Sequence, residues 1–277
     1  MLSIVLAATC ALVWGTADFS GGKAAQRGDA LAVTVVSQLL SVPALAICLL
    51  LVPGTPQVGD LAWGALSGMA GFAGMVLLYQ ALAGGAMSVV APVTAVTAAV
   101  VPIVVGLVIE GSPGTVPLVG VGCAVAAIGL VSLGSDGRHA VVTRVLIALA
   151  LTAGAMFGLF FILLDQASAG SGMWPLVGVR VGSLAVGLLA AAHRGTPLRL
   201  RGSALRWAAV AGPLDVTANG LFLAAVNAGN LVLVAPVASL YPASTVLLAL
   251  VVDRERLRPV QLAGLGLAAA ALVITAS

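Results

Sequence analysis

Asp215 and Arg180 are the two ionisable residues that lie deepest inside long apolar stretches of the sequence. A charge at membrane depth costs about 2.5–3.5 kcal/mol on insertion scales, so it normally has a partner or faces a wet cavity. The predicted depths of the two residues differ by about 7 Å, which an arginine side chain can span. One interpretation is that Asp215 carries a coupling proton or binds a cationic group while Arg180 holds a substrate carboxylate. The other is that the two charges only neutralise each other, because a nearby arginine makes an aspartate a poor proton carrier near neutral pH.

Asp18 and Trp14 lie one helical turn apart on the same face of the first apolar stretch. The other three tryptophans fall near predicted helix ends, as interfacial anchors do; they are Trp63, Trp174 and Trp207. Trp14 does not, so it is predicted either to line a cavity or to pack against lipid and other helices. Asp18 is a second candidate for coupling, with solvation near the end of its helix as the alternative.

Uncharged polar residues and two prolines complete the candidate site. The polar residues are candidates for directional hydrogen bonds in a central cavity, or for bonds between helices that contribute about 0.6 kcal/mol each on average; they are Gln38, Thr94, Thr97, Asn219, Ser239 and Tyr241. Pro92 and Pro236 interrupt the backbone hydrogen bonds of two apolar stretches. They predict either a hinge beside the site or simple kinked packing. A run of glycines predicts close helix packing; it consists of Gly64, Gly68, Gly71 and Gly74.

No arrangement in the sequence is typical of an enzyme, a metal centre or an ATP-driven pump. His139 and His193 lie beside arginines, without Cys, His or carboxylate neighbours at metal-ligand spacing. Residues 21–24 lack the spacing and the Ser or Thr of a phosphate-binding loop. An odd number of cysteines within apolar runs argues against a disulfide framework; they are Cys10, Cys48 and Cys123. We expect no catalytic residues, no metal and no cofactor.

The composition places the whole chain in a membrane. Of its 277 residues 61% are apolar and only 8% are charged, whereas a soluble domain has roughly a quarter of its residues charged. The apolar runs are about 18 to 24 residues long, and a helix needs about 20 to cross the hydrocarbon core. Such continuous runs exclude the alternating pattern of a β-barrel. The net charge of +3 does not form a basic stripe with interleaved aromatics, so we expect no nucleic-acid partner.

Turn residues divide the chain into ten predicted spans. Glycine, proline and charged residues mark the breaks, and no loop is long enough to form a soluble domain. The predicted helices cover residues 2–19, 30–52, 61–83, 87–109, 116–133, 141–164, 173–192, 205–226, 231–252 and 259–275.

An internal repeat relates the two halves of the chain. A shift of 144 residues places Ala81 to Leu130 on Ala225 to Ile274 without a gap, and brings the Ala-Pro dipeptides of Pro92 and Pro236 together. Near the starts of the halves, Trp14-Gly15 corresponds to Phe157-Gly158 at a shift of 143. Five helices per half is an odd number, so the second half enters the membrane inverted. Of the 12 Lys and Arg residues, all except Arg180 then lie on one face, which supports the inversion independently.

These residues resemble the EamA-type members of the drug/metabolite transporter superfamily, over essentially the whole chain. Trp14-Gly15 precedes Asp18-Phe19-Ser20-Gly21-Gly22 in the first helix, and Val90-Ala91-Pro92 matches Val234-Ala235-Pro236 in the fourth and ninth. The ninth helix continues as Leu240-Tyr241-Pro242 toward Glu255-Arg256-Leu257, similar to the proline-containing helix of that family that closes on a loop glutamate; Glu110 is the displaced counterpart in the first half. Arg180 resembles an arginine often present in the second helix of a half.

The resemblance implies an all-α integral membrane protein with ten transmembrane helices in two inverted five-helix repeats, residues 1–135 and 141–277. It also implies a secondary transporter, an exporter of small metabolites such as amino acids or related solutes, working by alternating access with proton coupling as one version. The alternative is a channel or a facilitative uniporter. We expect a multi-pass protein of the plasma or inner membrane, a monomer or homodimer, whose partners are a small-molecule substrate, the lipid bilayer and, in the coupled version, protons. The basic loops predict that the termini lie outside the cell, whereas the resemblance implies that they lie inside.

Overall fold

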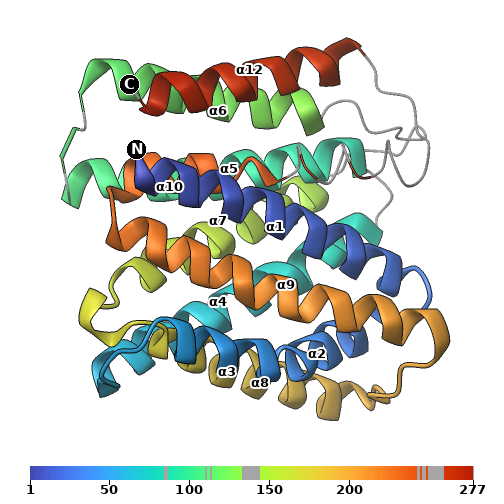
Figure 1. Ribbon diagram of the computed structural model, residues 1–277. Helices are drawn as coiled ribbons and strands as arrows, with labels where there is room; N and C mark the ends of the chain where they lie inside the picture. The colour runs from blue at the N-terminus through green and yellow to red at the C-terminus, as the bar shows by residue number, and fades with distance from the viewer. Residues whose placement is uncertain are drawn as a thin grey trace.

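The computed structural model is all helical over the residues that it describes (Figure 1). These are residues 1–83, 87–109, 111–112, 114–132, 144–241, 244, 248 and 259–276. The helices lie side by side along one direction, and both termini lie at the same end, on the left of the view. We call this end the terminal face and the opposite end the basic face.

The first half of the chain follows the predicted spans closely. Its helices are α1 (Leu2–Ala25), α2 (Ala30–Leu40), α3 (Val42–Leu51), α4 (Val58–Ala83), α5 (Met87–Ile109) and α6 (Thr115–Ser132). α1 extends beyond the predicted end at residue 19, because Gly21 and Gly22 stay helical instead of forming a turn. Asp18 therefore lies well inside the helix and not beside its end.

The second half contains α7 (Arg144–Asp165), the short 3₁₀ helix η1 (Ala169–Ser171), α8 (Trp174–Arg194), α9 (Gly202–Asn227), α10 (Leu231–Ala238) and α12 (Pro259–Ala276). The ninth predicted helix, residues 231–252, is interrupted where α10 ends at Ala238. Most of its remainder lies outside the described residues.

The second predicted helix is likewise broken, at Ser41. α2 ends at Leu40, Ser41 forms the turn, and α3 begins with Pro43 in its first turn. Proline has no N–H to continue the ladder of backbone hydrogen bonds, and its ring displaces the preceding carbonyl. The two pieces still form one apolar span, Ala30–Leu51.

The outer surface of the helices is suited to lipid. Six helical segments of the described chain are long and apolar enough to cross a membrane; they are α1, α2 with α3, α4, α7, α8 and α9. Shorter apolar segments lie in α5, α6 and α12. Large apolar side chains point outward along these helices, with Leu50 and Val108 both 82% exposed. Contiguous apolar surface of this kind is stable against lipid and not against water.

The pattern of helix–helix contacts stays the same when each helix is replaced by its counterpart in the other half of the chain. α1 packs against α9 as α7 packs against α4, and α1 against α10 as α7 against α5. Three contacts join corresponding helices and are their own counterparts: α6 with α12, α5 with α10, and α2 with α8. This pattern is the one that two inverted repeats related by a two-fold axis require.

Two matching glycines give the same result at the level of residues. A Cβ atom on Gly15 in α1 would lie 2.5 Å from the carbonyl oxygen of Tyr241, in the stretch that follows α10. A Cβ atom on Gly158 in α7 would lie 2.8 Å from Val101 in α5. Each glycine therefore lets the first helix of its half approach the fourth-helix region of the other half, as the predicted match of Gly15 with Gly158 requires.

Glycines also hold α4 against α8 and α7. Added Cβ atoms would come within 2.0 Å of the Pro175 carbonyl oxygen at Gly64 and within 2.1 Å of the Val179 carbonyl oxygen at Gly68. Farther along the helix, Gly71 and Gly74 face aromatic rings of α7. The predicted role of this glycine run in close helix packing is confirmed, and the packing fixes the position of α8.

Candidate functional site

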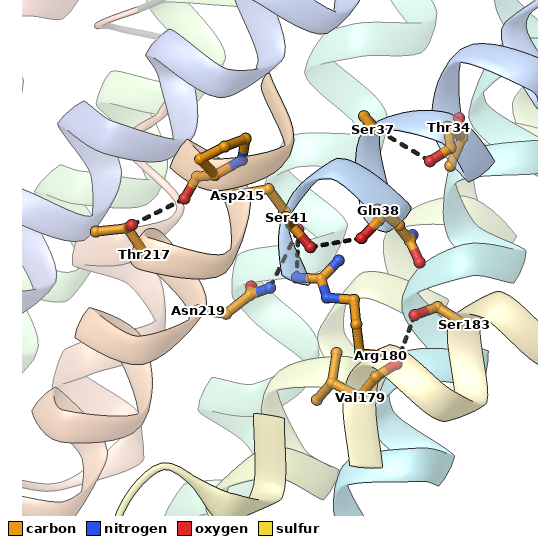
Figure 2. Close-up of polar contacts among 11 residues, drawn as sticks. Thr34, Ser37, Gln38, Ser41, Val179, Arg180, Ser183, Asp215, Thr217 and Asn219 are labelled. Carbon is orange, nitrogen blue, oxygen red and sulfur yellow. Dashed lines mark hydrogen bonds and ion pairs between the residues drawn. The ribbon is translucent and has the colours of Figure 1, made fainter. Parts of the chain in front are cut away.

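Arg180 and Asp215 form an ion pair between α8 and α9. Nη2 of Arg180 donates a hydrogen bond to Oδ2 of Asp215 over 3.0 Å, and Nδ2 of Asn219 donates to the same oxygen over 3.3 Å (Figure 2). The arginine is buried, with 4% of its side chain exposed, whereas 38% of the Asp215 side chain is exposed. The structure therefore brings three of the predicted site residues together.

Close backbone contacts on two sides position this pair. Gly178 and Gly182 lie against the α4 backbone, with added Cβ atoms 2.2 and 2.1 Å from its carbonyl oxygens. Arg180 lies two residues from each, so it points from the opposite face of α8, toward α9. On α9, Gly212 lies so close to α2 that a Cβ atom would be 1.9 Å from the Ser37 carbonyl oxygen.

The turn at the end of α2 brings Gln38 and Ser41 beside the guanidinium group of Arg180 (Figure 2). Oγ of Ser41 donates to the Gln38 carbonyl oxygen over 2.6 Å. Two buried polar atoms in this region have no hydrogen-bond partner, Oε1 of Gln38 and Nε of Arg180. An unsatisfied buried donor or acceptor costs about 1–3 kcal/mol. The polar cluster of Gln38, Arg180, Asp215 and Asn219, which we call the central cluster, therefore has unused hydrogen-bonding capacity.

Asp18 and Tyr241 extend the central cluster electrostatically. The Asp18 carboxylate is exposed and lies within electrostatic range of both Asp215 and the Tyr241 hydroxyl group. Two carboxylates, from α1 and α9, thus influence each other across a contact between the halves.

Trp14 lies at the centre of an aromatic group. Its ring packs at centroid distances of 5.6 Å from Phe161, 5.8 Å from Phe222 and 6.2 Å from Phe160. Only 9% of the tryptophan is exposed. The structure thus places Trp14 among side chains of the core, which matches the packing interpretation; the cavity-wall role stays a prediction.

The remaining predicted residues lie away from the central cluster. Thr94 donates to the Ala150 carbonyl oxygen over 3.1 Å, and Thr97 donates within its own helix, to Val93. Ser239 is fully buried at the end of α10, and its hydroxyl group has no partner. Pro236 lies inside α10, close to that break. The side chain of Pro92 is not described by the structure, and Glu110, Pro242 and Glu255 lie outside the described residues.

Asp60 is a buried acid that the sequence analysis did not single out. It lies in the first turn of α4, is 6% exposed, and accepts hydrogen bonds from the backbone N–H of Ser168 over 3.2 Å and from the hydroxyl groups of Ser168 and Ser171. These serines belong to the connection between α7 and α8. Sequence spacing gives no signal for the contact, because 108 residues separate Asp60 from Ser168.

Two further hydrogen bonds join the same connections on the terminal face. Nε1 of Trp174 donates to the Gly54 carbonyl oxygen, and the N–H of Thr55 donates to the Gly170 carbonyl oxygen, both over 3.1 Å. We call these bonds and those of Asp60 the terminal latch. It ties the α3–α4 connection of the first half to the α7–α8 connection of the second.

When the two halves are exchanged, the connections of the terminal latch correspond to residues 26–29 and 195–201 on the basic face. No hydrogen bond joins these two segments, both of which the structure describes in full. They border an open pocket of about 300 Å³ lined by Arg27, Asp29, Arg199 and Arg201, among others. A larger pocket, about 440 Å³, lies beside Trp174 near the terminal face. Hydrogen bonds therefore tie the connections together on the terminal face, whereas none joins the equivalent described segments on the basic face.

Comparison with known families identifies the class of protein. The EamA-like transporter family matches the chain twice, over residues 1–133 and 144–277. The chain belongs to the EamA-like transporter family. It is a multi-pass membrane transporter of the drug/metabolite transporter superfamily and not an enzyme, and one match per half agrees with the inverted repeats seen in the packing. No group of three or more potential metal ligands occurs among the described residues.

Solved structures support the fold. A chain described only as "Crystal structure of protein" matches with a TM-score of 0.77 at 13% identity, covering 98% of this chain and 95% of that chain. At this identity the likeness concerns the fold alone. No curated protein sequence matches significantly.

Proposed function

We propose that this EamA-like protein is a secondary transporter that exports small metabolites, such as amino acids or related solutes, by alternating access. The observation that supports it most is the buried Arg180 paired with Asp215 between two spans. Ionisable residues inside spans are expensive and typically mark substrate or ion pathways. Here the pair also has the exposed Asp18 within electrostatic range of Asp215, which suits a site that exchanges charge with an aqueous cavity.

In this proposal the two halves, residues 1–135 and 141–277, rock against each other around the central cluster. Arg180 binds an anionic group of the solute, and Asp18 and Asp215 couple its movement to protons. The remaining predicted residues line the pathway; they are Trp14, Gln38, Thr94, Thr97, Asn219, Ser239 and Tyr241. Pro92 and Pro236 serve as hinges at matching positions of the halves.

The charge distribution supports an orientation for this transporter. The basic face includes Arg27 just after α1, Arg194 at the end of α8 and Arg199 in the α8–α9 connection. Cytoplasmic loops carry an excess of Lys and Arg, so the basic face is assigned to the cytoplasm of a plasma or inner membrane. Export then loads the solute from the basic face, where no hydrogen bond joins the two described connections, and releases it at the terminal face.

Counterflow in proteoliposomes tests the carrier. Protein reconstituted with an unlabelled solute inside is expected to accumulate the labelled solute transiently and to saturate, across a panel of amino acids and organic anions. Arg180→Gln is expected to abolish this activity, while Arg199→Gln, a matched change on the basic face, retains it. Flux that neither saturates nor shows counterflow would indicate a channel, and counterflow that ignores a proton gradient would indicate a uniporter.

A further inference from the structure

The two partners of the central ion pair differ in their surroundings. Arg180 is almost fully buried and keeps its charge at any physiological pH, so it always requires an anion. Asp215 is more than a third exposed, so its carboxylate is far less enclosed than the guanidinium group. A buried cation whose partner is removed costs about 3–5 kcal/mol. Whenever Asp215 is protonated, another anion is therefore strongly favoured beside Arg180.

The guanidinium group is only half used in the observed pair. Of the Arg180 nitrogens only Nη2 donates to Asp215, and the buried Nε–H of Arg180 has no acceptor. A carboxylate bound across Nε and Nη2 would accept two parallel hydrogen bonds, the strongest arrangement for this pair of groups. Oε1 of Gln38, the other unsatisfied atom, offers an acceptor to a donor on the same ligand. These unused atoms are what an incoming anion needs.

We propose that Arg180 changes partners during transport: a compact carboxylate of the solute replaces Asp215 on the guanidinium group, and Asp215 takes up one proton from water. The proposal rests on the transporter function above and specifies its coupling as symport. One proton leaves with each solute anion, so the outward gradient of the solute has to drive export. Before the exchange the site holds Arg⁺ and Asp⁻; afterwards it holds Arg⁺, the anion and neutral Asp. Its net charge does not change, which avoids placing an extra charge in a low-dielectric environment.

The groups around Asp215 fit this exchange. α1 contributes the Asp18 carboxylate and the Cys10 thiol, both within electrostatic range. α8 contributes Arg180, α2 contributes the uncharged Gln38, and the turn after α2 contributes the uncharged Ser41. α3, α7 and α10, which also contact α9, carry no charged side chain outside the ends of α7 among the described residues, and α3 adds the thiol of Cys48. Arg180 is therefore the single described cation beside Asp215, and once it turns to the solute, no described cation remains beside that carboxylate.

Acetate is a suitable probe, because it is a compact carboxylate and stays ionised between pH 6 and pH 8. The measurement is thermal stability of the purified protein in detergent against sodium acetate, with sodium chloride at the same ionic strength as the reference. In Asp215→Asn residue 215 has no carboxylate to pair with Arg180 at any pH. Acetate is therefore expected to stabilise this variant in a saturable way and without pH dependence. In the unsubstituted protein binding requires one proton, so half-saturation is expected to need about tenfold more acetate per pH unit while Asp215 is ionised.

The double variant Arg180→Gln with Asp215→Asn is the control, because it removes both charges at nearly constant volume and leaves no unpaired charge. It is expected to show no acetate effect beyond that of chloride. Equal stabilisation of the double variant, no stabilisation of Asp215→Asn, or the same acetate dependence at pH 6 and pH 8 in the unsubstituted protein would each overturn the exchange. The test involves no transport. If counterflow persists but acetate does not stabilise the protein, the transporter function stands and only the exchange is refuted. If acetate acts as expected but counterflow is absent, the transporter function is refuted.

Discussion

Replacing Asp60 by alanine is expected to open the terminal face. The substitution removes the acceptor for the Ser168 N–H and for two hydroxyl groups. The hydroxyl groups can turn to other acceptors, but the N–H cannot, so the latched state loses about 2 kcal/mol at the 1–3 kcal/mol typical of an unsatisfied buried donor. A state in which the connections are already apart loses nothing. The equilibrium therefore shifts toward it by about thirtyfold, at 1.4 kcal/mol for each factor of ten.

A buried reporter beside the latch can measure this shift. Ala167, in the α7–α8 connection, is 4% exposed, so Ala167→Cys in a background without Cys10, Cys48 and Cys123 reacts with a maleimide only when the face opens. The labelling rate follows the open fraction when opening is fast and is expected to rise about thirtyfold with Asp60→Ala.

Two controls separate opening from general loosening. Gln166→Ala alters an exposed side chain of the same connection whose one described bond, to Ile162, is 3.4 Å long, and it should leave the rate unchanged. Ala204→Cys, 3% exposed beside the basic-face pocket, should not label faster. An unchanged rate at Ala167→Cys, or equal acceleration at both faces, would refute the latch.

Three other outcomes are expected. Gly212→Ala forces α2 away from α9, since its Cβ atom would lie 1.9 Å from Ser37; it should lower the melting temperature by an amount equivalent to about 1–3 kcal/mol, whereas Gly266→Ala, with no neighbour within 4 Å, should not. A cysteine added after Ser277 should react with an impermeant maleimide in intact cells, while Arg199→Cys should not, because the basic face is assigned to the cytoplasm; the opposite pattern would invert the orientation. Asp18→Asn together with Asp215→Asn should retain counterflow but lose its response to a proton gradient, and a preserved response would exclude both residues from coupling.

The sequence predicts most helices well because lipid imposes a simple rule. Every backbone polar group must be satisfied within the helix, so the length of an apolar run nearly equals the length of a span. α5 was predicted at its observed bounds for this reason. The rule fails at Gly21 and Gly22, where a helix continues through residues that make turns in water, and at Ser41 and Pro43, where a break lies within an unbroken apolar run.

The central cluster and the terminal latch differ in how far sequence predicts them. Arg180 and Asp215 are conspicuous as charges inside apolar runs, and their predicted depths differ by no more than an arginine side chain can span. Asp60 sits near the start of its helix, where an acid is ordinarily solvated or favourable to the helix dipole. Its partners are small hydroxyl residues on a distant connection, and nothing in the sequence marks them as buried.

The two halves are related by a two-fold axis, yet the connections at the two faces differ in their hydrogen bonds, and this difference bears on the transport mechanism. Five hydrogen bonds, three of them to the buried Asp60, tie the two connections together on the terminal face, and none joins the equivalent described segments on the basic face. Inverted repeats allow each half to adopt the conformation of the other, so the opposite state should loosen 53–57 from 168–172 and pack 26–29 against 195–201. Gly28 already lies close to Leu200 there, with an added Cβ atom 3.1 Å away. Closure would bring Arg27, Arg199 and Arg201 together around one described acid, Asp29. Closure of the basic face is therefore expected to be the less stable state at low ionic strength and to gain from salt, which screens repulsion between the arginines.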